Sequence, residues 1–116
     1  MPRILLVEDD ANVCALMEHV LPGAGYQVDP TATAAGARML LAGGGYDLVL
    51  TDGVLPDGTG MHIAEEADRQ GIRAMIVTAY AFRFLKRELA RYAVLLKPVR
   101  PDELLKAVKD ALKPSA

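Results

Sequence analysis

DLVLTDGVLPDGTG, residues 47–60, places an apolar run, a single carboxylate at Asp52 and a loop rich in Gly, Pro and Asp one after another. The run at residues 48–50 is continuous rather than alternating, which is typical of a strand buried on both faces, as in a parallel sheet. The loop residues are those that tight turns favour. The stretch therefore predicts a buried strand that ends close to Asp52, where the chain returns to solvent.

Other apolar runs share this continuous character. They are residues 4–7, 75–77 and 94–96, with residues 26–29 as a weaker run. Each is of strand length and too short for a typical helix. Together with residues 48–50 they predict a sheet of five strands.

Helical patterns fill the segments between these runs. Asp10 is a favourable N-cap, and an apolar stripe of helical period follows it. Thr33 and Gly43 are an ordinary start and stop for a second helix at residues 34–42. The remaining predicted helices are residues 61–70, residues 81–91 and a last helix that begins at Pro101. The stripe of the first helix consists of Val13, Leu16, Met17, Val20 and Leu21.

Strands that alternate with helices imply βα units with right-handed crossovers. The predicted fold is therefore α/β, a doubly wound five-stranded parallel sheet with helices on both faces. Its expected strand order is the flavodoxin-like 2-1-3-4-5.

The composition is that of an ordinary globular domain. The 116 residues, 52% hydrophobic and 24% charged, suffice for a single domain spanning 1–116. A net charge of −2 gives no indication of a nucleic-acid or membrane surface. No apolar run approaches the roughly 20 residues of a membrane-spanning helix. The single cysteine, Cys14, excludes an internal disulfide and suits a reducing compartment, so we expect a cytoplasmic protein.

Four of the predicted strands end in residues that can bind ions or phosphate. In an open parallel sheet, ligands bind outside the carboxyl ends of the strands, where the strand order reverses. The order 2-1-3-4-5 would place these four strands side by side. The sequence therefore predicts one pocket, with Glu8, Asp9, Asp10, Asp52, Thr78 and Lys97 around it.

Crowded carboxylates repel one another and need a counter-charge. Mg²⁺ is a hard cation that typically takes one or two carboxylates together with phosphate oxygens and water, whereas Asp10 is better explained as a helix cap. Lys97 adds a flexible positive charge and Thr78 a hydroxyl donor. These groups suit an incoming phosphoryl group, whose transfer depends on positioning and charge neutralisation. Asp52 would then be the nucleophile that forms an acyl phosphate.

Four motifs, ILLVEDD, LTDGVLPDGTG, VTA and LKP, occur in this order at the strand ends. Together they resemble the CheY-like receiver domain of two-component response regulators, over about residues 2–113. The resemblance implies that Asp52 accepts a phosphoryl group from a sensor histidine kinase or a histidine phosphotransfer protein. It also implies Mg²⁺ as the cofactor, bound by Glu8, Asp9, Asp52 and the backbone carbonyl of Val54.

The same resemblance assigns roles to further residues. Thr78 and Lys97 would contact the phosphoryl group, the Lys97-Pro98 bond would be cis, and Gly60 would close the loop before the third helix. The protein would not be an enzyme acting on other substrates. It would be a phosphoacceptor that catalyses its own phosphoryl transfer and autodephosphorylation.

The sequence departs from the family pattern at two places. Glu8 stands where Asp is commonest, and Val94 stands where the family has its aromatic switch residue. An aromatic occurs instead at Tyr80, two residues after the threonine, as in a subgroup of stand-alone receivers. Val54 and Tyr80 also occupy the positions that tune autodephosphorylation in the family. We expect an apolar and a bulky residue there to hinder water and prolong the lifetime of the phosphoryl group.

The expected output is contact with a downstream protein whose identity the sequence does not specify. Basic residues Arg83, Lys86, Arg87 and Arg91 would share one face of the helix at residues 81–91. We expect phosphorylation to reposition this helix and the following strand. Neither nucleic acid nor a membrane is expected as a direct partner.

Alternatives come from other classes. A flavodoxin-like cofactor binder would hold phosphate after the first strand, where Glu8 and Asp9 would repel it. A phosphatase of the haloacid dehalogenase type needs a second Asp two residues after the nucleophile, at the position of Val54. Two readings stay open: a receiver-like module that binds partners without phosphorylation, and a receiver that is part of a longer regulator, although Met1 directly before the first strand favours a natural start.

Overall fold

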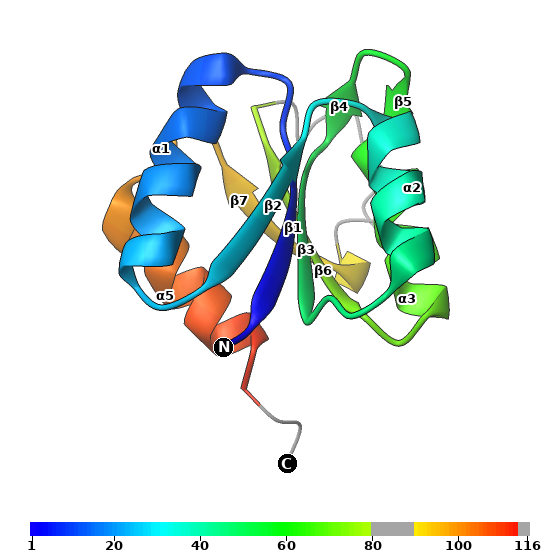
Figure 1. The fold of residues 1–116 in the computed structure, drawn as a ribbon. Coiled ribbons are helices and arrows are strands. Elements are labelled where there is room, and N and C mark those ends of the chain that lie inside the picture. Colours follow the sequence, from blue (N-terminus) through cyan, green and yellow to red (C-terminus); the bar gives the residue numbers. More distant parts are fainter. Residues whose placement is uncertain (80–89, 114–116) are drawn as a thin grey trace.

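The structure, a computed structural model, describes residues 1–79 and 90–113. Its centre is a five-stranded sheet in which every neighbouring pair is parallel. The spatial order is β2-β1-β3-β6-β7 (Figure 1). In chain order these are the first to fifth strands of the sheet, so the predicted order 2-1-3-4-5 is confirmed. The strands are β1 (Arg3–Val7), β2 (Gln27–Thr31), β3 (Leu48–Asp52), β6 (Arg73–Thr78) and β7 (Ala93–Leu96).

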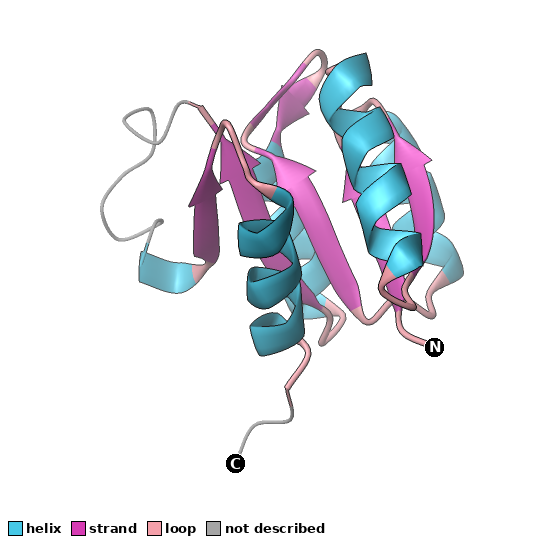
Figure 2. Cartoon of the chain, turned by 90° about the vertical axis from the view of Figure 1, so that its left-hand side faces the viewer, coloured by secondary structure: helices cyan, strands magenta, loops and turns pink. Residues whose placement is uncertain are grey.

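Helices cover both faces of the sheet, as Figures 1 and 2 show. α1 (Ala11–Gly23) and α5 (Pro101–Ala111) lie on one face, and α2 (Ala34–Gly43) and α3 (Gly60–Arg69) lie on the other. Each face has its own apolar core: Leu6, Leu50 and Met75 face α1 and α5 in one, and Leu5 and Val49 face α2 and α3 in the other. β1, β3 and most of β6 are buried on both sides, which explains their continuous apolar runs. The edge strands β2 and β7 are only partly buried, and Leu96 at the end of β7 is exposed, so the run at residues 94–96 is a strand but not a fully buried one.

The helix starts follow the predicted capping. The Asp10 carboxylate accepts hydrogen bonds from the N–H groups of Asn12 and Val13 at the start of α1, and the Thr33 hydroxyl accepts one from Gly36 at the start of α2. Pro101 is the first residue of α5. Most of the helix predicted at residues 81–91 lies outside the described residues; its last two, residues 90 and 91, are helical.

The predicted apolar stripe of α1 is wider, by one residue, than the face of the helix that packs against the sheet. Met17 is buried and Val13 packs against the core, but Leu16 is 41% exposed. Leu16 is rotated by about 100° from Met17 around the helix axis, which places it at the margin of the buried face. The apolar stripe of the sequence therefore extends one residue beyond the face of α1 that the sheet buries.

The loop after Asp52 contains a small hairpin that the sequence did not predict. β4 (Val54–Leu55) and β5 (Gly58–Thr59) pair antiparallel across a two-residue turn, beside the beginning of α2 (Figure 1). Gly60 then starts α3 in close contact with β3: a Cβ at this position would lie 1.9 Å from the backbone oxygen of Asp52. Only glycine fits there, because a backbone atom cannot move aside as a flexible side chain can.

Within residues 1–79 and 90–113, no helix has the length and apolar character needed to cross a bilayer.

Candidate functional site

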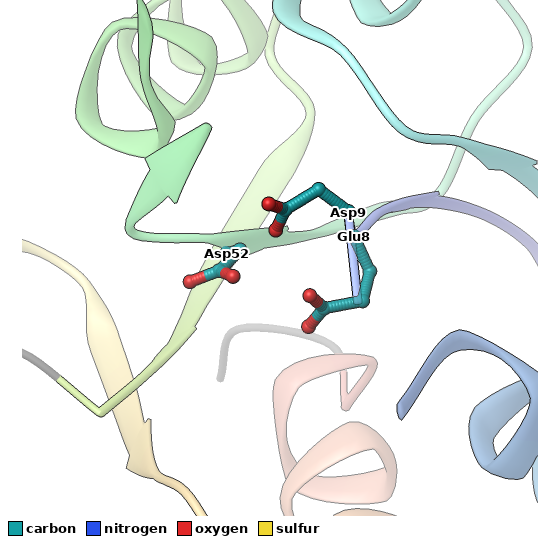
Figure 3. Close-up of side chains that lie close together, drawn as sticks. All are labelled: Glu8, Asp9 and Asp52. Carbon is teal, nitrogen blue, oxygen red and sulfur yellow. The ribbon is translucent and has the colours of Figure 1, made fainter. Parts of the chain in front are cut away.

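Three carboxylates meet at the carboxyl ends of β1 and β3. Asp52 is the last residue of β3 and is 8% exposed, whereas Glu8, directly after β1, is 3% exposed and Asp9 is exposed. One oxygen from each lies within 4.8 Å of the others. In Figure 3, the carboxylates of Glu8 and Asp9 extend from the end of β1 toward Asp52. Adjacent parallel strands bring them together because both strands end at the same edge of the sheet.

Lys97 provides the positive charge of this cluster. It follows β7, and its Nζ lies 2.8 Å from Oε1 of Glu8 and 3.0 Å from Oδ2 of Asp52. Burial opposes the charged form of Lys97, but the hydrogen bonds to the two carboxylates outweigh it and raise the pKa of Lys97 above its ordinary value. Lys97 is therefore a firmly charged ammonium that bridges two acids from different strands.

Glu8 is the most deeply buried acid of the cluster. Burial raises its pKa, and the hydrogen bonds from Lys97 and from the Asp10 N–H offset part of that effect. The longer side chain of Glu8 allows direct contact with Lys97 while its second oxygen accepts the Asp10 N–H at 3.1 Å. The Lys97 ammonium thus favours the ionised form of Glu8, against the effect of burial.

The balance of charge shows what else the cluster can hold. Three carboxylates face one ammonium, so two negative charges remain uncompensated when all groups are ionised. This is the charge of one divalent cation, and carboxylate oxygens are the ligands that hard cations such as Mg²⁺ prefer. The residues present therefore fit a divalent cation, held beside Asp52 by Glu8 and Asp9.

Thr78 and the Lys97-Pro98 bond lie beside this cluster. Thr78 is the last residue of β6 and is fully buried, and its backbone oxygen accepts the Lys97 N–H at 3.0 Å. The Lys97-Pro98 peptide is cis, as the resemblance implied. β3, β6 and β7 are consecutive neighbours in the sheet, so Asp52, Thr78 and Lys97 come from three adjacent strand ends.

The remaining predicted residues are placed in part. Val54 begins β4, is half-buried, and its N–H donates to Oδ1 of Asp52 at 3.4 Å. Val94 lies on β7 opposite Ile76 and is half-buried. Tyr80 lies outside the described residues, as do three of the four basic residues predicted to share a helix face: Arg83, Lys86 and Arg87.

Arg91, the fourth of those basic residues, is described. It forms an ion pair with Asp68 of α3 at 3.1 Å, with both side chains more than half exposed. Its guanidinium therefore contacts α3.

The residue that sequence reasoning missed is Asp57, on the turn of the β4–β5 hairpin. Its carboxylate accepts the N–H groups of Ala34 and Ala35 at the start of α2. One signal could have suggested such a contact: α2 has no acidic residue in its own first turn, so its N-terminal N–H groups can be satisfied from elsewhere.

Comparisons with known proteins agree with this geometry. The family model described as the response regulator receiver domain matches residues 4–109. The swarming motility regulation protein RssB of Serratia marcescens is 38% identical over 112 residues, which cover 92% of this chain and 51% of RssB. The chain thus spans about half the length of that curated relative.

Solved structures of receiver proteins superpose closely. A CheY-like receiver domain protein from Methanospirillum hungatei is 32% identical, with a TM-score of 0.87 over 97% of this chain and 94% of that one. The response regulator TrrA of Thermotoga maritima, solved in complex with Mg²⁺ and BeF, is 29% identical, with a TM-score of 0.86 over 97% of this chain and all of TrrA. TrrA has also been solved in complex with the histidine kinase ThkA. With a family model that matches nearly the whole chain and an acidic cluster at the matching strand ends, this protein belongs to the response regulator receiver domain family.

Proposed function

We propose that the chain is a phosphorylation-activated signalling switch that accepts a phosphoryl group on Asp52. The observation that carries this proposal is the position of Lys97, whose ammonium bridges the nucleophile Asp52 and the acid Glu8 at 3.0 and 2.8 Å. A lysine and an acidic cluster on either side of one carboxylate supply the positive and metal-binding groups that phosphoryl transfer needs.

The reacting atom is a carboxylate oxygen of Asp52. It attacks phosphorus in line with the bond to the donor nitrogen of a phosphohistidine. The new O–P bond forms as the P–N bond breaks, and the bonding electron pair returns to the imidazole, which takes up a proton. The product is an aspartyl phosphate, a mixed anhydride.

Glu8, Asp9, Asp52 and the backbone carbonyl of Val54 would hold Mg²⁺. When bound, the cation neutralises charge on the phosphoryl oxygens during transfer. Lys97 keeps its charge and, on its flexible stem, moves from Glu8 and Asp52 to a phosphoryl oxygen. The Thr78 hydroxyl donates a hydrogen bond to another phosphoryl oxygen. The same groups support hydrolysis of the aspartyl phosphate, so the protein catalyses both its own phosphorylation and its autodephosphorylation.

The phosphoryl donor is a sensor histidine kinase or a histidine phosphotransfer protein in the cytoplasm. The complex of TrrA with ThkA supports the kinase, because TrrA is 28% identical to this chain in that structure. The output is contact with a downstream protein rather than direct binding of nucleic acid or membrane. Phosphorylation adds nearly two negative charges beside Lys97 and Thr78, which biases the adjacent surface between two arrangements. An apolar Val54 and a bulky Tyr80 make the phosphoryl group long-lived.

The test is the intact mass of the protein after treatment with acetyl phosphate and Mg²⁺. We expect a phosphate-sized gain for the wild type, a strongly reduced gain in EDTA, and none for Asp52→Ala. Asp110→Asn, at an exposed acid in the last turn of α5, is the matched control and should be phosphorylated like the wild type. Failure of the wild type to gain mass from either acetyl phosphate or a phosphorylated kinase would favour a receiver-like module that acts without phosphorylation.

A further inference from the structure

Asp57 connects the loop after the phosphoacceptor to α2. Its Oδ1 accepts the N–H of Ala34 at 2.7 Å and its Oδ2 accepts that of Ala35 at 3.0 Å, across more than 20 residues of chain. These two hydrogen bonds lower the pKa of Asp57 although the side chain is exposed. At neutral pH the carboxylate is therefore charged and binds the helix N-terminus through both oxygens.

The beginning of α2 is complete only with this contact. The Thr33 hydroxyl accepts the N–H of Gly36 at 3.0 Å, and the Thr33 carbonyl accepts that of Ala37. The first two N–H groups, of Ala34 and Ala35, are those that Asp57 accepts. The carboxylate also places a negative charge at the positive end of the helix dipole.

The β4–β5 hairpin needs such an anchor. Its strands have two residues each, and a hairpin of that size is not stable by itself. At its base, the Gly60 N–H donates to the Gly53 carbonyl at 3.0 Å, and at its centre Leu55 is buried in the core under α2. Asp57 holds the tip. Val54, the first hairpin residue, lies between the anchored tip and Asp52, so the position of its backbone depends on both ends.

We propose that Asp57 is a positioning residue for the Mg²⁺ site: by fixing the hairpin tip on α2, it sets the place of the Val54 backbone beside Glu8, Asp9 and Asp52. Asp57 touches neither the cation nor the phosphoryl group and acts through Val54. The inference rests on the proposed function, because the Val54 carbonyl has a role only if the acidic cluster binds Mg²⁺.

The experiment measures the dissociation constant of Mg²⁺ by NMR titration of the ¹⁵N-labelled, unphosphorylated protein. Residues that orient metal ligands typically change affinity by 10–100-fold, so we expect Asp57→Ala to bind Mg²⁺ about tenfold more weakly than the wild type. Asp57→Asn keeps one acceptor oxygen for one of the two N–H groups and should lie between Asp57→Ala and the wild type.

Thr33→Ala is the matched control. It removes the other side-chain cap of α2 and lowers the melting temperature, but it leaves the hairpin attached. Its Mg²⁺ affinity should equal that of the wild type, which separates positioning from simple loss of stability.

The outcomes distinguish the inference from the function beneath it. The role of Asp57 would be overturned if the wild type, Asp57→Ala and Asp57→Asn bound Mg²⁺ with equal affinity. It would also be overturned if Thr33→Ala weakened Mg²⁺ binding as much as Asp57→Ala does. If the wild type binds no Mg²⁺ at all, the metal site of the proposed function fails instead, and with it the basis of the inference.

Discussion

Removal of the Lys97 ammonium should destabilise the metal-free protein. Lys97→Met retains most of the apolar stem, which lines a groove with Val13, Pro98 and other residues, and deletes the charge that Glu8 and Asp52 share. At 2.8 and 3.0 Å the Coulomb attraction is about 6 kcal/mol per pair at an effective dielectric constant of about 20, before desolvation is subtracted. Removing one partner of a buried ion pair costs about 3–5 kcal/mol in measured cases.

We expect the lower end of that range, about 3 kcal/mol, because the Lys97 side chain is 17% exposed and solvent screens part of the interaction. For a domain of this size the loss corresponds to a fall of about 10 °C in melting temperature. The assay is urea unfolding followed by far-UV circular dichroism, in EDTA and in Mg²⁺. Mg²⁺ at ten times its dissociation constant adds about 1.4 kcal/mol to either protein. At one fixed Mg²⁺ concentration the gain should be larger for the variant, because no lysine competes for the carboxylates and the dissociation constant for Mg²⁺ is therefore lower.

The pH dependence gives a second check. Burial raises the pKa of Glu8 above 4.5 and Lys97 partly offsets this, so Glu8 in the variant has a still higher pKa. Protonation of a group with a raised folded-state pKa stabilises the folded protein; the effect is complete below 4.5 and is lost as the pH rises through the folded-state pKa. The deficit of Lys97→Met should therefore shrink as the pH falls.

The control is Lys113→Met, which removes an ion pair to Asp110 with side chains 65% and 53% exposed. Such a pair contributes at most about 1 kcal/mol. Either of two results would refute the coupling of Lys97 to Glu8 and Asp52. The first is a Lys97→Met variant that is as stable as the wild type in EDTA. The second is a Lys113→Met variant that loses as much unfolding free energy as Lys97→Met.

Two further predictions concern the loop and the opposite end of the sheet. Gly60→Ala should cost about 3 kcal/mol in unfolding free energy and slow phosphorylation by acetyl phosphate, because the new Cβ overlaps the Asp52 backbone oxygen; Gly43→Ala, where a Cβ has open space, should be neutral in both measurements. The Asp29 carboxylate accepts hydrogen bonds from the Tyr46 hydroxyl at 2.8 Å and from the Arg3 guanidinium at 2.9 Å, and these contacts lower the pKa of Asp29. Asp29→Asn should cost about 1 kcal/mol at pH 7, since both charged groups are about a third exposed. The folded-state pKa of Asp29 lies below 3.8, so the carboxylate stabilises the protein above that pH and ceases to do so as the pH falls through the lowered pKa. In thermal melts, the melting temperatures of the wild type and Asp29→Asn should therefore converge at low pH.

Local features of the sequence were sufficient for the fold. Residues 48–50 and the runs at residues 4–7 and 75–77 mark strands that are buried on both faces, and the other two runs mark the partly buried edge strands. Asp10, Thr33 and Pro101 mark the helix starts because capping involves only residues within one turn of one another. Strand ends are also local, so the sequence placed Glu8, Asp9, Asp52, Thr78 and Lys97 at one edge as soon as a parallel sheet was inferred.

Contacts between distant segments could not be derived in this way. Lys97 could have pointed to solvent, and only packing of β7 beside β6 brings its ammonium to Glu8, nearly 90 residues earlier. The hairpin after Asp52 has strands too short for a periodic signal, and its stability comes from Leu55 in the core and Asp57 on α2. Periodicity and capping report on neighbours along the chain, whereas ion pairs and hairpin anchors depend on which surfaces meet. Sequence pattern alone therefore predicts the strands, the helices and the edge of the sheet that carries Asp52. Tertiary packing alone decides which groups Lys97 and Asp57 contact.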